Sequence, residues 1–355
     1  MLQFVYEALP GRVVFGPGSF DHLPEEVARL GAGRALLVST PGHRQLAEDA
    51  AERLGAKAAG IWDRARMHVP IENAQAAQAE ARRVGADLCV ALGGGTPIGL
   101  AKAIALELDV PIVAVPTTYA GSEMTPVLGI TEAGVKRTRR DPRMLPKTVI
   151  YDPELTFTLP AAVSGPSGMN AIAHCVEALY ARDANPVTSL MAEEGIRALA
   201  RSLPVVVREP DHLEARAEAL YGAWLAGTAL AAVGMALHHK LCHVLGGSFD
   251  LPHAEVHTIV LPHATAYNRA GAPAAMARIA RALDAEDAAG GLYDLAAALG
   301  AKLRLADIGL RESDLERAAD LATEDPYPNP TPLTRERIRA LLDDAFHGRR
   351  PAPDG

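Results

Sequence analysis

Half of the 12 histidines of this chain lie between positions 238 and 263. They are His238, His239, His243, His253, His257 and His263. A helix would place His239 and His243 on one face, because they are four residues apart. Gly246 and Gly247 could end that helix, and His253 would then follow a proline in the next loop. Imidazoles bind metals and transfer protons near neutral pH, and the stretch therefore indicates a chemical site.

A second polar group lies on a helix predicted from Ser167 to Tyr180. Asn170, His174 and Glu177 form a polar stripe on a helix that is otherwise apolar, and buried polar groups need partners. A lone His174 would most simply be a hydrogen-bonded core histidine. Three imidazoles suit a divalent transition metal, although the neutral amide of Asn170 is a poor ligand. Four histidines could surround one site: His174, His239, His243 and His253.

Composition restricts the class of protein. The chain has 355 residues, 49% hydrophobic and 22% charged, which favours a globular enzyme of two domains. A formal net charge of -8 gives no reason to expect nucleic acid or a membrane as a partner. Three widely spaced cysteines read as buried free thiols: Cys89, Cys175 and Cys242. Without a signal-peptide pattern or a long apolar run, the chain is expected to be cytoplasmic.

Apolar runs that alternate with helical patterns predict an α/β domain over residues 1–155. The runs 35–38, 87–92 and 111–115 read as strands buried on both faces, which favours a Rossmann-like parallel sheet. A small antiparallel piece is expected between 127 and 152, in which 129–131 and 148–151 flank a basic loop. Over residues 156–355 helical patterns dominate, so the second domain is predicted to be all-α.

A glycine-rich turn predicts a nucleotide site in the first domain. Gly93, Gly94, Gly95 and Thr96 follow an apolar strand and open a helix. Glycines let the backbone approach a pyrophosphate, and the helix N-terminus offers free N–H groups to it. The spacing is not G-x-G-x-x-G, so an ordinary turn remains an equal alternative.

Two further strand ends support the nucleotide interpretation. Thr117, Thr118 and then Ser122 follow the next strand, where hydroxyls suit phosphate contacts, although Ser122 could instead cap a helix. Ser39 and Thr40 follow the first strand, where an acidic residue would bind the adenosine ribose and repel a 2′-phosphate. Neither NADH nor NADPH is therefore excluded.

These segments resemble those of the maleylacetate reductases, a branch of the iron-containing alcohol dehydrogenase family with a dehydroquinate synthase-like architecture. The resemblance implies NADH or NADPH as cofactor and a homodimer. It also implies reduction of a small dicarboxylate enone, maleylacetate, to 3-oxoadipate in the breakdown of aromatic compounds. It covers nearly the whole chain and, besides the triple glycine, includes the segments 11–16, 116–124, 167–174, 238–263 and 326–330.

The resemblance also implies roles for single residues. The wider family holds iron or zinc at positions that correspond here to Asn170, His174, His239 and His253. Asn170 stands in place of an aspartate, the one anionic ligand, so these positions are expected to lack a tightly bound metal. A metal-dependent alcohol or aldehyde reductase and a dehydroquinate synthase-like lyase remain alternatives, and both would need the full ligand set.

The implied reaction needs acids and cations. His243, which the resemblance places beside the substrate, and His253 are expected to donate to the substrate oxygen, with His239 and His174 orienting or co-donating. Lys240 is the candidate partner for a substrate carboxylate. The roles of two further segments stay open. The basic run 136–143 could bind a carboxylate or be a solvated loop. The Pro-rich loop with Tyr327 and Asn329 could close on the site or be a rigid connection.

Overall fold

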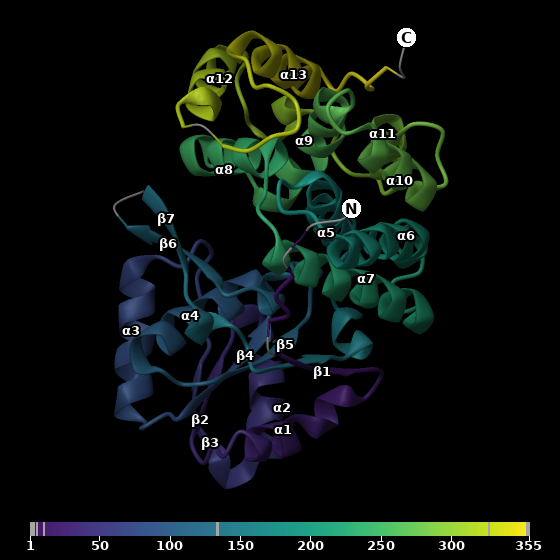
Figure 1. The fold of residues 1–355 in the computed structure, drawn as a ribbon. Helices are drawn as coiled ribbons and strands as arrows, with labels where there is room; N and C mark the ends of the chain where they lie inside the picture. Colours follow the sequence, from purple (N-terminus) through teal and green to yellow (C-terminus); the bar gives the residue numbers. More distant parts are fainter. Residues whose placement is uncertain (1–3, 5, 10, 133–134, 326, 353–355) are drawn as a thin grey trace. The chain divides into compact units, whose positions relative to one another are not determined.

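The computed structural model describes residues 4, 6–9, 11–132, 135–325 and 327–352 and divides the chain into two units. One unit spans Leu9–Leu159. The other contains Pro160–Gly355 together with Met1–Ala8. The first is built on a sheet and the second on helices (Figure 1).

A six-stranded sheet with the order β1-β8-β5-β4-β2-β3 forms the centre of the first unit. All of its strand pairs are parallel, and β2, β4 and β5 are buried along their whole length, as expected for a sheet covered on both faces. The predicted α/β domain with a parallel sheet is confirmed. The strands are β1 (Arg12–Phe15), β2 (Ala35–Val38), β3 (Ala58–Trp62), β4 (Leu88–Gly93), β5 (Ile112–Pro116) and β8 (Thr148–Tyr151).

Helices cover the two faces of this sheet (Figure 1). α1 (Leu23–Arg29) and α2 (Arg44–Leu54) share one core with alternate strand residues such as Leu37, Val90 and Val113. α3 (Ile71–Arg83) and α4 (Gly95–Leu108) pack against each other on the opposite side. Because successive strand residues point to opposite faces, each strand feeds both layers and must be apolar throughout.

Residues 136–140 of the basic run form a strand and only its end is a turn, so the prediction of the run as a loop was wrong for most of its length. β6 (Val127–Glu132) pairs antiparallel with β7 (Val135–Arg140), whereas β8 lies between β1 and β5 in the parallel sheet. The antiparallel piece was thus predicted in the right region with the wrong partner. β8 is apolar enough on both faces to be buried between two helix layers, while residues 137–140 are exposed and suit only a strand that faces solvent.

The described part of the second unit, residues 160–325 and 327–352, contains helices and no strand, which confirms the all-α prediction. The helix α6 (Pro186–Arg208) shows how local sequence sets a helix start: Asn185 caps it in a reciprocal capping box with Thr188, and Pro186 occupies the first turn. The longer helices are α5 (Ala161–Tyr180), α6 (Pro186–Arg208), α7 (Leu213–Ala232), α8 (Leu237–Phe249), α9 (His253–Asn268), α10 (Pro273–Leu283), α11 (Ala288–Ala298), α12 (Leu315–Thr323) and α13 (Arg335–His347).

The histidine-rich stretch forms two helices whose ends differ from the prediction. α8 continues through Gly246 and Gly247 and stops at Asp250, which adopts the left-handed conformation with φ 53°. His253 is the first residue of α9 and not part of a loop. Tertiary packing overrides the low helix propensity of two glycines, because α8 buries Leu237, Leu241 and other apolar side chains in the core of the unit.

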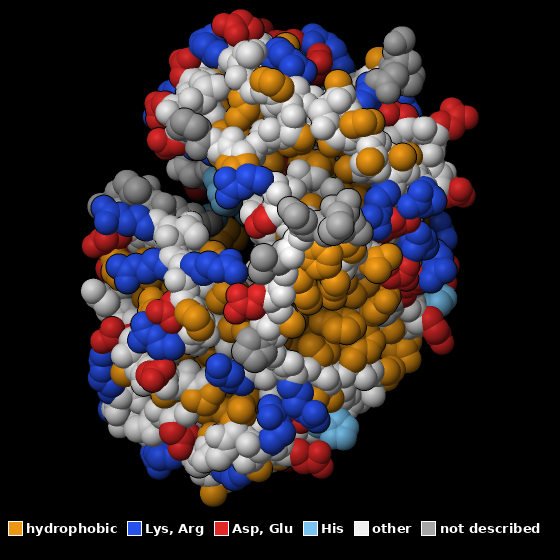
Figure 2. Space-filling view, in the orientation of Figure 1, with side chains coloured by type: hydrophobic (Ala, Val, Ile, Leu, Met, Phe, Trp, Pro, Cys, Tyr) orange, Lys and Arg blue, Asp and Glu red, His pale blue; other side chains and the backbone are white. Residues whose placement is uncertain are grey.

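Exposed charges of both signs are interleaved on the helices near the top of Figure 2. Arg335, for example, pairs with Glu316 and Asp320 across α12 and α13.

Among the described residues no single helix is long and apolar enough to cross a membrane, although the bent pair α7 and α8 passes the same test of length and composition.

Candidate active site

Three helices of the second unit bring the candidate histidines together. His174 comes from α5, His239 and His243 from α8, and His253 and His257 from α9. The ring centroids of His174 and His239 lie 5.1 Å apart, and those of His239 and His243 lie 6.3 Å apart. His257 connects the rest, at 5.0 Å from His239 and 4.2 Å from His253.

The histidines of this cluster differ in exposure to solvent. His243 and His253 are exposed, whereas His174 and His239 are 4% and 6% exposed and His257 is fully buried. The exposed rings are therefore the ones that an incoming molecule can contact first, and the buried rings support them from behind.

Burial keeps the inner imidazoles neutral. It lowers the pKa of His238 to about 4 and holds the pKa of His174, His239 and His257 well below the usual value. Neighbouring imidazoles add to the effect, because a second positive charge nearby would be repelled. At neutral pH the inner rings consequently offer lone pairs as well as N–H groups.

Several polar atoms in this region have no hydrogen-bond partner among the described residues. They include Asn170 Oδ1, His174 Nδ1 and His239 Nε2, all buried. Leaving such an atom unsatisfied costs about 1–3 kcal/mol. These atoms therefore mark a place where a bound molecule, a water or a cation would be stabilised.

The donor set fits a tightly bound metal poorly. The positions that the family resemblance implies, Asn170, His174, His239 and His253, contain no negative charge, because Asn170 replaces the aspartate of the wider family. Three imidazoles suit a divalent metal, but the fourth ligand would then have to be a water and not a carboxylate. Ligand atoms of His238, His239 and His257 lie within 4.8 Å of one another, but this group shares only His239 with the implied set and is also neutral.

The sequence predicts no role for His238, His257 or Glu177, although the structure places all three in the cluster. His257 is four residues from His253, and that helical spacing was a usable signal. Glu177 belongs to the polar stripe of α5, and its carboxylate lies 2.8 Å from His239 Nδ1. The contact joins residues far apart in the chain, so no local pattern could reveal it.

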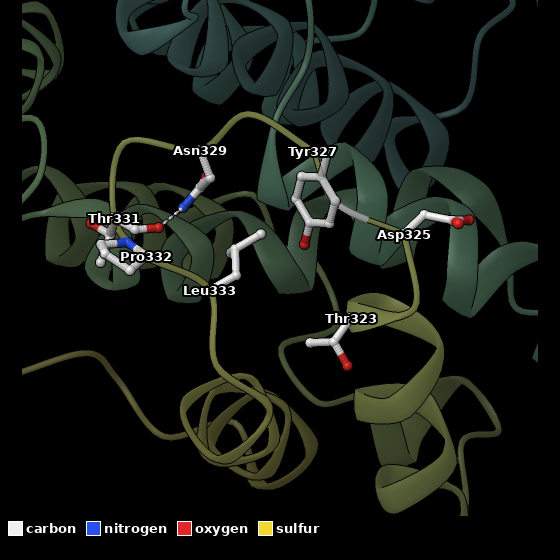
Figure 3. A pocket seen from close by; sticks show the side chains of 7 residues that line it. All are labelled: Thr323, Asp325, Tyr327, Asn329, Thr331, Pro332 and Leu333. Carbon is white, nitrogen blue, oxygen red and sulfur yellow. Dashed lines mark hydrogen bonds between the residues drawn. The ribbon is translucent and has the colours of Figure 1, made fainter.

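Lys240 lies at a pocket beside these helices. Its Nζ is 4.0 Å from the Asp325 carboxylate and 5.7 Å from the centroid of the Tyr327 ring. Asp325 and Tyr327 line a pocket of about 340 Å³, seen in Figure 3. The other lining residues are Thr323, Asn329, Thr331, Pro332 and Leu333.

The Pro-rich loop is anchored where Asn329 lies. Asn329 Nδ2 donates to Asn268 Oδ1 at 2.6 Å and to the Thr331 carbonyl at 2.7 Å. In return, Asn268 Nδ2 donates to Asn329 Oδ1 at 3.0 Å. The reciprocal amide pair favours the rigid connection over a closing loop.

The candidate nucleotide residues of the first unit lie at one edge of its sheet, where β2, β4 and β5 end. His43, which the sequence did not indicate, joins two of these ends: its Nδ1 is 2.9 Å from Thr40 Oγ1 and its Nε2 is 3.1 Å from Thr117 Oγ1. The Oγ of Ser39 is buried there without a partner among the described residues.

The glycine-rich turn suits the approach of a phosphate. Gly93 has φ +126°, and a Cβ added to Gly94 would lie 3.0 Å from the Thr118 side chain, so larger residues would not fit without a shift. α4 begins at Gly95, with Thr96 in its first turn, and no side chain caps it. Its free N–H groups and dipole fit the pyrophosphate of a dinucleotide.

The segment after β5 is fixed by a buried lysine. Lys102 of α4 donates from Nζ to the Ser122 carbonyl at 2.6 Å, Ser122 Oγ at 3.1 Å, Thr125 Oγ1 at 3.0 Å and the Val127 carbonyl at 2.9 Å. Ser122 begins a short 3-10 turn whose N-cap is Gly121, so it does not cap a helix with its side chain. Lys102 thus fixes the position of Ser122, one of the candidate nucleotide residues.

Burial lowers the pKa of Lys102 to about 7, and the nearby Glu123 acts in the opposite direction. From about pH 7 up to the usual lysine pKa of 10.5, the folded chain binds fewer protons here than the unfolded chain. Stability therefore gains from Lys102 as pH rises through this window. We expect Lys102→Met to lack this gain in thermal unfolding midpoints measured across the window, with the exposed Lys147→Met as control. Parallel pH curves for all three proteins would contradict the expectation.

Comparison with known proteins identifies relatives over the full length. The profile of iron-containing alcohol dehydrogenases matches residues 10–153, and the profile of the C-terminal part of the same family matches residues 165–346. The chain is 56% identical to a maleylacetate reductase from Burkholderia cepacia, with 99% of this chain and 100% of that protein covered. A maleylacetate reductase from Sphingobium indicum is 54% identical, with 99% of each chain covered. The crystal structure of maleylacetate reductase from Agrobacterium tumefaciens shares 54% identity and a TM-score of 0.96, over 99% of this chain and 100% of that one.

Proposed function

This chain belongs to the iron-containing alcohol dehydrogenase family, and from that premise we propose that it is an oxidoreductase that reduces maleylacetate to 3-oxoadipate with NAD(P)H. The observation that carries the proposal is the 56% identity over the whole chain to a maleylacetate reductase. The neutral donor set around Asn170 supports it, because a reduction of this kind can proceed without a metal.

The chemistry follows from the substrate, an enone with two carboxylates. The bound cofactor supplies a hydride to the alkene carbon that is β to the ketone. The C=C π electrons then move toward the ketone oxygen and form an enolate, which takes one proton at the α-carbon to give 3-oxoadipate. A conjugated enolate is less basic than an alkoxide, so hydrogen-bond donors can stabilise it.

We assign the donor role to the exposed rings, His243 and His253. They are the accessible histidines of the cluster and can donate to the ketone oxygen and deliver the proton. The buried His174 and His239 hold this arrangement from behind. Lys240, at the rim of the pocket, is our candidate for pairing with one substrate carboxylate, in competition with Asp325.

The cofactor residues proposed are those at the sheet edge of the first unit. NADH and NADPH are both compatible with Ser39 and Thr40, which carry no charge to reject a 2′-phosphate. If a divalent metal binds in the second unit, we expect it to be weakly held, because its ligands would be neutral. A homodimer in the cytoplasm, with neither nucleic acid nor a membrane as partner, completes the proposal.

A spectrophotometric assay tests the function directly. NAD(P)H oxidation should be rapid with maleylacetate, slow with a simple aldehyde, and unchanged by a chelator. Aldehyde reduction that the chelator abolishes, with no turnover of maleylacetate, would instead identify a metal-dependent alcohol dehydrogenase. Running NADH and NADPH side by side in the same assay determines the cofactor preference.

A further inference from the structure

One carboxylate of the histidine cluster takes no part in the reaction proposed above. Glu177 of α5 is fully buried, and its two oxygens receive hydrogen bonds from the start of α8. The backbone N–H of His238 donates to Oε1 at 2.8 Å, and that of Ala236 donates to Oε2 at 2.8 Å. The His239 N–H lies 3.4 Å from Oε2, and His239 Nδ1 lies 2.8 Å from the same atom.

These contacts show that Glu177 caps α8 from another helix. The N-cap residue of α8 is Ala236, whose side chain cannot accept a hydrogen bond, and no side chain of the helix itself caps it. The first N–H groups of a helix otherwise lack partners and carry the positive end of its dipole. A carboxylate there is stabilised by charge-assisted hydrogen bonds, which explains how a buried acid is accommodated.

The same contacts decide which nitrogen of His239 carries the proton. Oε2 of Glu177 already accepts two backbone N–H groups, so it is a poor place for a carboxyl hydrogen. The hydrogen between Oε2 and Nδ1 therefore belongs to His239, whose Nδ1–H donates. A neutral imidazole has one N–H, so Nε2 of His239 carries a lone pair.

His238 supports this assignment from the other side. Its Nε2 is 3.0 Å from the backbone carbonyl of His257, which can only accept, so that Nε2 carries the hydrogen. The Nδ1 of His238 then has a lone pair, and it faces His239 Nδ1 at 3.4 Å. A lone pair on both of these nitrogens would be repulsive, whereas an N–H on His239 is favourable.

We propose that Glu177 is a positioning residue that fixes His239 in its Nδ1–H tautomer and thereby presents the Nε2 lone pair to the active site. Nε2 is buried and has no partner among the described residues, so it is available to a hydrogen-bond donor or a cation. The inference rests on the proposed function only where it places this lone pair at the site of maleylacetate reduction. The expectation that His239 co-donates to the substrate oxygen changes, because a neutral His239 with its hydrogen on Nδ1 accepts at Nε2.

The tautomer can be observed without any assay. The ¹⁵N chemical shifts of histidine-labelled protein distinguish a protonated Nδ1 from a protonated Nε2, and the His239→Gln variant assigns the signals. We expect the Nδ1–H form in the unaltered protein. In Glu177→Gln the amide oxygen can still accept at the Oε2 position, so the Nδ1–H form should persist, whereas Glu177→Leu removes the acceptor and the signals should change toward the Nε2–H form. An Nε2–H form of His239 in the unaltered protein would overturn the inference.

Kinetics give the second readout. Supporting partners of this kind typically affect activity by about 10–100-fold, so Glu177→Leu, which removes the acceptor, should lower kcat for maleylacetate by about that factor, with little change in the KM for the cofactor. Glu177→Asp keeps the charge and should recover part of kcat, while the exposed Glu214→Leu serves as control. An unchanged kcat in a folded Glu177→Leu protein would refute the positioning role. Absence of maleylacetate turnover in the unaltered protein would instead refute the proposed function.

Discussion

Replacing His243 with alanine should lower kcat for maleylacetate by about 10²–10⁴-fold, the usual contribution of a positioned acid or base. His243 is an exposed ring of the cluster, and its centroid lies 6.3 Å from that of the buried His239. Its loss removes the proposed donor to the enolate and changes none of the candidate nucleotide residues. Steady-state kinetics with each substrate varied in turn measure the effect, and the KM for the cofactor should stay within a small factor.

The control for this variant is His347→Ala, which removes a histidine from the last turn of α13 and away from the cluster. Thermal unfolding of both variants shows whether folding is intact. Because His243 is exposed, its truncation should cost little stability. If kcat is unchanged in the folded His243→Ala protein, the proton donor must be sought elsewhere, with His253 as the next candidate.

Replacing Asn170 with aspartate should convert the neutral histidine cluster beside it into a metal site. Asn170 is 6% exposed and its Oδ1 has no partner among the described residues, so a carboxylate there would be buried and uncompensated. Without metal, the unfolding midpoint of Asn170→Asp should fall by several degrees, because an unpaired buried charge is costly. With Zn²⁺ added, the midpoint should rise again, since a ligand that binds only the folded chain stabilises it.

Affinity for Zn²⁺, measured by titration calorimetry, should increase on the order of 10²-fold or more in Asn170→Asp. A tenfold change corresponds to about 1.4 kcal/mol, and the attraction between unit charges near a protein surface is about 4 kcal/mol at 4 Å. Asn170→Ala is the matched control, because it removes the amide without adding charge, and it should not tighten binding. Equal Zn²⁺ affinities for the unaltered protein and the Asn170→Asp variant would show that this position does not limit metal binding.

Much of the fold can be predicted from local patterns. The apolar runs at 35–38, 87–92 and 111–115 are parallel strands, because a strand buried on both faces must be apolar at every position. The helical half follows equally from its apolar periodicity and from signals such as the cap at Asn185. The partner of β8 could not be predicted, because sheet order depends on which segments meet and not on the segment itself.

Residue types and their spacing were sufficient to indicate the family, the two architectures and the composition of the site: a glycine-rich turn, four histidines, and an asparagine where a carboxylate would be needed. The folded chain was required to show how the histidines divide into exposed and buried rings, and that His43 joins Thr40 to Thr117. It was also required to show that Glu177 holds His239. The physical reason is that residue type and spacing are properties of one segment, whereas burial, tautomer and hydrogen-bond partner depend on segments that meet only when the chain folds.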